Sequence, residues 1–120
     1  MELKSLPQSF SVCRVEDLTG IGGEYFFTAQ TPEENSLICP SISVPKNATA
    51  REDNWRGFFI TGVLDFSLIG ILSEISTVLA QEKIGIVAVS TYNTDYIFVK
   101  ENNFSRALSA LKKSGYTVLD

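Results

Sequence analysis

The 120-residue chain contains no histidine, which removes the side chain that most often acts as a general base near neutral pH. It contains only two cysteines, Cys13 and Cys39, and two thiols without histidine are too few soft ligands for a zinc site. Both lie in apolar segments, so in a reducing cytosol we expect buried thiols. No serine sits in a nucleophile-elbow pattern either. We therefore expect a protein that is not an enzyme and that uses no metal or cofactor.

Long apolar runs are also absent. No stretch approaches the about 20 consecutive apolar residues that a membrane-spanning helix needs. The first residues, MELKSLPQSF, lack the charged and then apolar pattern of a secretion signal. These absences lead us to expect a cytoplasmic protein with no membrane partner.

Clusters of lysine and arginine are missing as well. The formal net charge is −4, and acidic residues outnumber basic ones in both halves of the chain. A protein that binds a polyanion needs grouped basic side chains to neutralise the phosphates. Nucleic acid is therefore excluded as an expected partner.

The apolar residues that are present give a clear pattern in the second half of the chain. Runs rich in aromatic and β-branched residues alternate with two amphipathic stripes of helical period. The stripes run from Ile71 to Leu79 and from Phe104 to Leu111. Strands are predicted at 57–63, 86–90, 96–99 and 116–119, with a turn in the TYNTD segment between the middle two. This order is βαββαβ, an α+β ferredoxin-like arrangement.

Residues near the predicted helix ends carry capping signals. Ser67 is the expected cap of the first helix, and Gly85 suits the left-handed position after it. Asn102 or Asn103 is expected to cap the second helix, and Gly115 to end it.

The first half of the chain has a weaker pattern. Strands are predicted at 10–15, 25–29 and 37–44, and Thr31 is expected to cap one helical turn. The polar segment PKNATARED at 45–53 reads as a linker. We therefore predict two units, a second α/β half at 1–56 that lacks its first helix and the βαββαβ domain at 57–120.

The stretch LDFSLIG at 64–70 joins a predicted strand to a predicted helix. Backbone N–H groups after a Ser67 cap could donate hydrogen bonds to a carboxylate, which the helix dipole at an exposed site favours by about 0.3–1 kcal/mol. Gly70 in the first helical turn would cost about 1 kcal/mol relative to alanine. We interpret that glycine as a site of close approach, either by a ligand or by a packed neighbour.

Two other features could indicate a phosphate-binding loop or a pair of catalytic carboxylates. The glycine-rich run at 20–23 precedes a strand rather than a helix, so a flexible loop is a better interpretation than a phosphate-binding loop. Asp65 and Asp95 could act as paired carboxylates, but both lie where aspartate commonly occurs, at strand ends or turns.

The block from TGVLDFSLIGIL through STYNTDYIFVKE to LKKSGY resembles an ACT domain, the small-molecule regulatory module of amino-acid metabolism. It is similar to tandem ACT-like bacterial proteins related to aspartate kinase regulatory regions, and to the cytosolic arginine sensors of animals. FSVCRV, TPEENSLIC and NWRGFFITG are similar to the degenerate first repeat of that family. The resemblance covers nearly the whole chain.

The resemblance implies a non-catalytic regulatory module that binds a free amino acid. We also expect a homodimer, because the strands of the second half are apolar on both faces and the first half is too small to cover much of them. The alternative is a structural or protein-interaction module with a vestigial ligand site. The implied ligand-binding residues fall in two groups, the loop Leu64, Asp65, Phe66, Ser67, Leu68, Ile69 and Gly70, and the strand and turn Ser90, Thr91, Tyr92, Asn93, Thr94 and Asp95. The α-carboxylate would meet the amides after Ser67, and the ammonium would meet Asp95 or Asp65.

Overall fold

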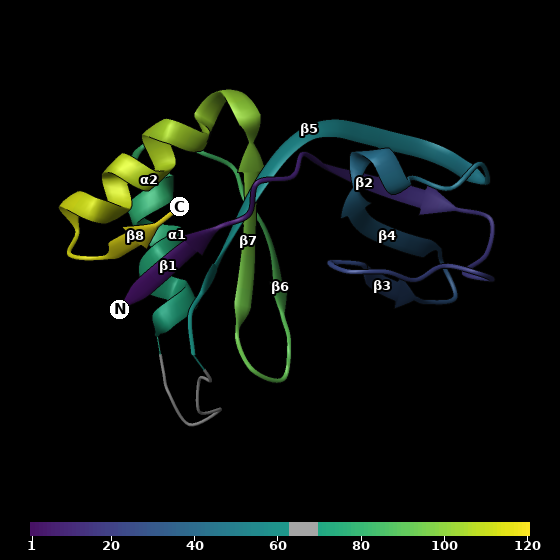
Figure 1. Cartoon of the computed structure of the whole chain (residues 1–120), viewed down its shortest axis with the longest axis horizontal. Coiled ribbons are helices and arrows are strands. Elements are labelled where there is room, and N and C mark those ends of the chain that lie inside the picture. Colours follow the sequence, from purple (N-terminus) through teal and green to yellow (C-terminus); the bar gives the residue numbers. More distant parts are fainter. Residues whose placement is uncertain (63–69) are drawn as a thin grey trace. The chain divides into compact units, whose positions relative to one another are not determined.

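The structure is a computed structural model that describes residues 1–62 and 70–120 (Figure 1). The chain forms two compact units. Unit 1 contains Met1–Pro7 and Arg56–Asp120, and unit 2 contains Gln8–Trp55. The sequence predicted a division at 56/57, and the structure additionally places the first seven residues with the C-terminal part of the chain.

Unit 1 combines a mixed sheet with two helices. Its sheet has the order β6-β7-β5-β1-β8. The elements are β1 (Glu2–Ser5), the end of β5 (Ala48–Ile60), α1 (Ile71–Gln81), β6 (Val87–Ser90), β7 (Asp95–Lys100), the 3-10 turn η2 (Glu101–Asn103), α2 (Phe104–Lys113) and β8 (Thr117–Leu119). From β5 to β8 this is the predicted α+β, βαββαβ order, and that prediction is confirmed.

One strand of unit 1 was not predicted. β1 pairs antiparallel with β5, where Leu3 faces Ile60, and parallel with β8, where Leu3 faces Val118. It therefore separates the first and last strands of the βαββαβ unit. Its four residues ELKS include a single large apolar side chain, which is too little for a pattern of period two to be seen.

The core of unit 1 lies between the helices and one face of the sheet. Alternate residues of β5 and β7 point into it, as expected for strands with period two. Phe58 and Ile60 come from β5, and Ile97 and Val99 from β7. Both helices contribute their predicted stripes, with Ile75, Leu79, Phe104, Ala107 and Leu111 buried.

Both helices end in the same hydrogen-bonded motif. After α1, the N–H of Ile84 donates to the carbonyl of Leu79 (3.0 Å) and the N–H of Lys83 donates to Ala80 (2.9 Å), a Schellman end. Lys83 takes the left-handed position, with φ +59°. The prediction that Gly85 fills this position is wrong, because α1 ends two residues earlier than that prediction required.

The start of α2 differs from the simple capping expectation. Asn103 holds the N-cap position, but its side chain makes no capping hydrogen bond. Its Oδ1 instead accepts a hydrogen bond from Arg106 (3.0 Å), and Arg106 also donates to the carbonyl of Glu82 just after α1. This arginine thus connects the start of α2 to the end of α1.

Unit 2 is an antiparallel sheet without an α-helix, whereas the sequence led us to expect an α/β half that lacks only its first helix. Its order is β3-β4-β2-β5. The strands are β2 (Phe10–Val15), β3 (Phe27–Gln30), β4 (Asn35–Pro40) and the first part of β5, and the 3-10 turn η1 (Ser41–Ser43) follows β4. Thr31 does not start a helical turn but closes the β3–β4 connection, where its Oγ1 accepts from the N–H groups of Glu33 and Glu34.

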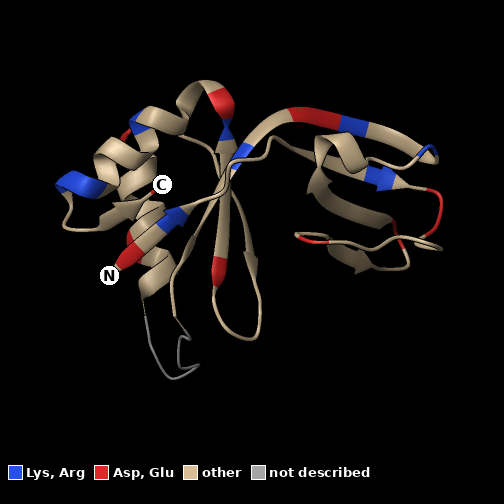
Figure 2. Cartoon of the chain, in the orientation of Figure 1, with Lys and Arg blue, Asp and Glu red and all other residues tan. Residues whose placement is uncertain are grey.

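The predicted linker at 45–53 is wrong in its C-terminal part. β5 begins at Ala48, and this part of it pairs with β2, with Ala50 opposite Arg14 and Glu52 opposite Val12. Strands pair through hydrogen bonds between backbone groups, so a strand with polar side chains and one solvated face can pair as well. Its sequence then lacks the apolar pattern that marks a buried strand. Basic and acidic positions follow one another closely along this strand (Figure 2).

The two cysteines lie in the core of unit 2, and the prediction of buried thiols is confirmed. Cys13 and Cys39 are buried with Val15 and Leu37. Burial is the main reason that the pKa of the Cys39 thiol rises to about 11, and it also raises the pKa of Cys13. Both thiols are therefore poor nucleophiles in the folded protein.

Within residues 1–62 and 70–120, no helix has the length and apolar character needed to cross a membrane.

Candidate functional site

The residue before α1 is the part of the predicted strand-to-helix loop that the structure describes. Leu64, Asp65, Phe66, Ser67, Leu68 and Ile69 lie outside the described residues. Gly70 occupies the N-cap position of α1, and its carbonyl accepts the first helical hydrogen bond from the N–H of Glu74 (2.8 Å). The predicted cap position is therefore corrected from Ser67 to Gly70.

The backbone conformation gives a physical reason for glycine at position 70 that the sequence did not suggest. Its φ is +86°, a left-handed conformation that costs an L-residue roughly 1–2 kcal/mol. A Cβ built at this position would meet no described atom within 4 Å. The left-handed backbone conformation by itself accounts for glycine at this position.

The β6–β7 hairpin carries the second group of predicted residues. Ser90, the last residue of β6, pairs with Asp95, the first residue of β7. The N–H of Thr91 donates to the carbonyl of Thr94 (2.8 Å), and the Thr91 hydroxyl donates to the same carbonyl (2.9 Å). The predicted turn is confirmed, with Tyr92 and Asn93 at its tip.

Thr94 connects this turn to the end of β5. Its side chain is buried, and its Oγ1 donates to the carbonyl of Ile60 at 2.7 Å. Ile60 is the last residue of β5, a few residues before the predicted loop begins. The structure thus brings the hairpin tip beside the strand that leads into the loop, while Tyr92 remains 80% exposed.

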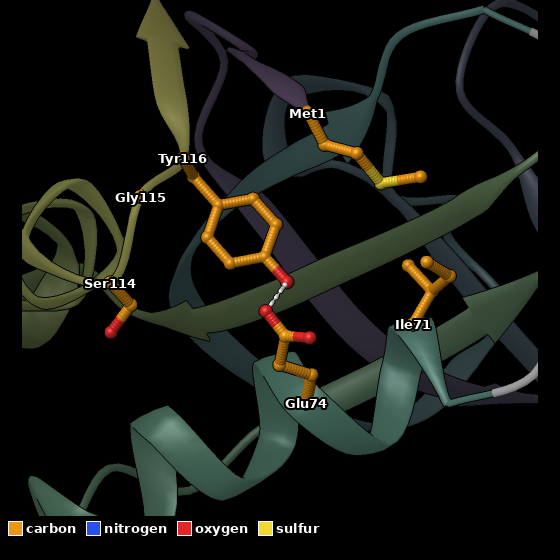
Figure 3. Close-up of a pocket in the computed structure, with 6 residues that line it drawn as sticks. All are labelled: Met1, Ile71, Glu74, Ser114, Gly115 and Tyr116. Carbon is orange, nitrogen blue, oxygen red and sulfur yellow. Dashed lines mark hydrogen bonds between the residues drawn. The ribbon is translucent and has the colours of Figure 1, made fainter.

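A pocket of unit 1 was not predicted from the sequence. It has a volume of about 160 Å³ and is open to solvent. Side chains from the first turn of α1 and from the end of α2 lie around it (Figure 3). The lining residues are Met1, Ile71, Glu74, Ser114, Gly115 and Tyr116.

The end of α2 places Tyr116 in this pocket. The N–H of Tyr116 donates to the carbonyl of Leu111 and that of Gly115 to Lys112, both at 3.1 Å, which completes a Schellman motif. Gly115 has φ +104°, so the prediction that it ends the helix is confirmed. Tyr116 and Leu111 are both buried in the core of unit 1, the apolar contact typical of this motif.

The hydroxyl group of Tyr116 points towards Glu74 (Figure 3). It donates a hydrogen bond to Glu74 Oε1 at 2.8 Å. Burial, followed by this hydrogen bond and the glutamate charge, raises the pKa of Tyr116 to about 12. The phenol therefore stays neutral and remains a donor at physiological pH.

No sequence signal marked this pair. Glu74 lies outside the apolar stripe of α1, and Tyr116 resembles the first residue of a short strand. The two are 42 positions apart, and only the packing of α1 against the end of α2 brings them together. A glutamate in the first turn of a helix and a tyrosine after the glycine that ends a helix are each common. Neither residue therefore indicated a site in the sequence.

A series of hydrogen-bonded side chains in unit 2 resembles a catalytic relay. Ser41 and Ser11 share a hydrogen bond of 2.7 Å, the Ser11 hydroxyl donates to Asp53 (2.5 Å), and Asp53 pairs with Arg51 (3.0 Å). Ser11 is completely buried and cannot reach a substrate. These hydrogen bonds give the buried Ser11 hydroxyl its partners and connect η1 to β2 and β5. Their role is therefore structural.

Comparison with known proteins places this geometry in a family. The family model described as the ACT domain matches residues 50–113, more than half of the chain. That span runs from within β5 to the last residue of α2. A search of curated protein sequences finds no match.

Solved structures share the fold. A protein from Agrobacterium tumefaciens has 26% identity and a TM-score of 0.88, with 98% of this chain and 91% of that chain covered. The regulatory subunit of aspartate kinase from Thermus thermophilus has 8% identity and a TM-score of 0.68, with 96% and 97% covered. Aspartate kinase from Clostridium acetobutylicum has 16% identity and a TM-score of 0.65, with 91% of this chain and 32% of the kinase covered.

Proposed function

Because this chain belongs to the ACT domain family, we propose that it is a non-catalytic regulatory module that binds a free amino acid beside the start of α1. The observation that carries the proposal is the family match over residues 50–113, which contains the strand-to-helix connection and the β6–β7 hairpin. The fold shared with the regulatory subunit of an aspartate kinase agrees with a regulatory role.

The described part of the proposed site supports recognition of an amino acid. Thr94 holds the hairpin tip against the end of β5, so side chains of the turn lie near the strand that enters the loop. Asp95 is half-buried at the start of β7 and offers a carboxylate for the ligand's ammonium group. The backbone amides after Ser67 would donate hydrogen bonds to the α-carboxylate of the ligand.

The chemistry of the chain supports binding rather than catalysis. The sequence contains no histidine, and Ser11, which is hydrogen-bonded to the carboxylate of Asp53 in unit 2, is fully buried. Both thiols are buried with raised pKa values. A ligand that changes the stability of the module could pass its occupancy to a partner without any covalent step.

We also propose that the module works as a homodimer. β6 is an outer strand of the unit 1 sheet and pairs only with β7 among the described strands. Its residues VAVS carry no charge and no proline, the two features that usually protect an exposed edge. A second copy could pair along this edge, which adjoins the hairpin of the proposed site.

A thermal-unfolding screen of the standard amino acids tests the proposed function. A ligand present at 100 times its dissociation constant adds about 2.7 kcal/mol to the free energy of unfolding. We expect one amino acid, or a few of related shape, to raise the unfolding temperature. If none does so at millimolar concentration, the amino-acid proposal fails and the chain is better described as an assembly module.

A further inference from the structure

The two thiols of unit 2 lie on the same face of neighbouring strands. β2 and β4 pair antiparallel (Figure 1), with Cys13 opposite Leu37 and Cys39 opposite Ser11. The cysteines are therefore diagonal neighbours, because residues two positions apart along a strand share a face. Their side chains share a hydrogen bond and belong to one buried cluster. The two sulfur atoms are thus already neighbours in the folded protein.

Cys13 is the thiol that loses its proton more readily. Burial raises the pKa of both thiols, to about 11 for Cys39. The hydrogen bond between them lowers the pKa of Cys13 and raises that of Cys39, because the Cys39 S–H donates to the Cys13 sulfur. Arg51 lies opposite Cys13 in β5, and its charge favours the Cys13 thiolate more than the charge of Asp53 opposes it. The pair thus contains a potential attacking thiolate and a thiol beside it.

One segment covers the two thiols. Residues 16–26 connect β2 to β3, and Leu18, Ile21 and Phe26 pack on the cysteine cluster while remaining only partly buried. Most other residues of this segment are exposed, and positions 20, 22 and 23 are glycines. A segment that few buried apolar contacts hold in place opens locally more easily than the strands of a sheet. Its displacement would give a small solute access to the thiols.

We propose that Cys13 and Cys39 form a redox pair, which a small-molecule disulfide such as oxidised glutathione converts into a disulfide bond between β2 and β4. The Cys13 thiolate attacks one sulfur of the reagent and releases one glutathione. The Cys39 sulfur then attacks Cys13 in the mixed disulfide, forms the new bond and releases the second glutathione. The two cysteines lose two electrons, which reduce the reagent, and the two thiol protons pass to the released glutathione molecules.

The position of the pair in the sheet predicts a reversible bond. Diagonal neighbours across an antiparallel pair have Cα atoms roughly 7–8 Å apart, which is at the upper limit for a disulfide. The bond therefore draws β2 and β4 together locally and stores strain. Strained disulfides are reduced more easily than relaxed ones, so a dithiol reductant should restore both thiols.

Incubation of the native full chain with oxidised glutathione, followed by mass spectrometry without reductant, tests this proposal. We expect an intact mass lower by two hydrogen atoms, a cross-linked peptide that joins Cys13 to Cys39, and recovery of both thiols with dithiothreitol. An unchanged mass, a stable glutathione adduct, or a bond that forms only in urea would overturn the proposal, because the folded arrangement would then not support the reaction.

Cysteine variants test the order of the two steps. Cys39→Ser removes the second thiol, so the reaction should stop at a glutathione adduct on Cys13. Cys13→Ser should react about tenfold more slowly, because the remaining thiol has the higher pKa and is less often ionised. Equal rates of adduct formation in the two variants would contradict the role of Cys13 as the attacking thiol.

A second pair of variants tests the covering segment. Ile21→Ala removes one of its apolar contacts and should speed disulfide formation about threefold. Thr19→Ala, an exposed residue of the same segment, is the matched control and should react as wild type. Equal rates in both variants would contradict access through this segment. An amino-acid screen in the presence of dithiothreitol keeps both thiols reduced, so the proposed function can fail or hold independently of the redox pair.

Discussion

At the scale of single residues, Tyr116 shows how local and tertiary structure together set the chemistry of a side chain. The Schellman end of α2 turns Tyr116 into the core, and α1 supplies the glutamate that accepts a hydrogen bond from its hydroxyl group. Neither event is visible in the sequence around residue 116. The neutral phenol is the form that both burial and the neighbouring charge favour.

The pKa of Tyr116 predicts a loss of stability at high pH. The folded pKa, about 12, lies above the ordinary value of 10.0, so the neutral phenol stabilises the folded state fully below pH 10. That contribution is lost as the pH rises from 10 to 12, and a difference of about two pKa units corresponds to about 2–3 kcal/mol. The difference in free energy of unfolding between wild type and Tyr116→Phe should fall by that amount across this range. Parallel curves for the two proteins would show that Tyr116 titrates normally.

Gly70 yields a second prediction at this scale, and its left-handed backbone conformation sets the sign. As an ordinary helical residue, Gly70→Ala would stabilise the protein, but with φ at +86° it should lower the free energy of unfolding by about 1 kcal/mol. Gly85→Ala is the matched control in the same unit, because Gly85 has neither a left-handed φ nor a near neighbour. Urea denaturation should show the control unchanged or slightly more stable. A stabilised Gly70→Ala variant would contradict the left-handed start of α1.

At the scale of elements, the predictions succeeded where side chains carry the signal. The two amphipathic stripes correspond to α1 and α2, and FSVCRV corresponds to β2 residue for residue. The misses are β1 and the first part of β5, whose ladders are held by backbone hydrogen bonds while few large apolar side chains mark them. The candidate site divides in the same way, because the hairpin at 90–95 followed from its turn residues and the Glu74–Tyr116 pocket depends on tertiary packing.

The end of α1 offers a prediction about helix termination. Lys83 has φ +59°, in the position that glycine prefers and that Gly115 fills after α2. Lys83→Gly should therefore raise the free energy of unfolding by up to about 1 kcal/mol, because the left-handed strain of an L-residue is removed. The converse change, Gly115→Lys, should lower it by a similar amount. Thermal unfolding of both variants measures the pair, and a destabilised Lys83→Gly would mean that the lysine side chain contributes more than its backbone strain costs.

At the scale of the whole molecule, the proposed homodimer gives a prediction about assembly. The uncharged edge of β6 should pair with the same edge of a second chain, so sedimentation at micromolar concentration should give the mass of a dimer. Val89→Lys places a charge on that edge and should shift the population to monomer without unfolding unit 1. The exposed control Thr77→Lys on α1 should remain dimeric. Sedimentation of the wild-type chain as a monomer would contradict the proposed homodimer.

The central claim is that the module recognises an amino acid through its charged groups, beside the start of α1. Isothermal titration calorimetry with the amino acid that stabilises the protein most, on wild type, Asp95→Asn and the exposed control Asp120→Asn, tests this claim most directly. Loss of one partner of a desolvated charge pair costs about 2–5 kcal/mol, so Asp95→Asn should weaken binding at least 30-fold while Asp120→Asn binds as wild type. Equal affinity in all three proteins would contradict the assignment of Asp95. The absence of measurable heat with any amino acid would contradict the claim itself.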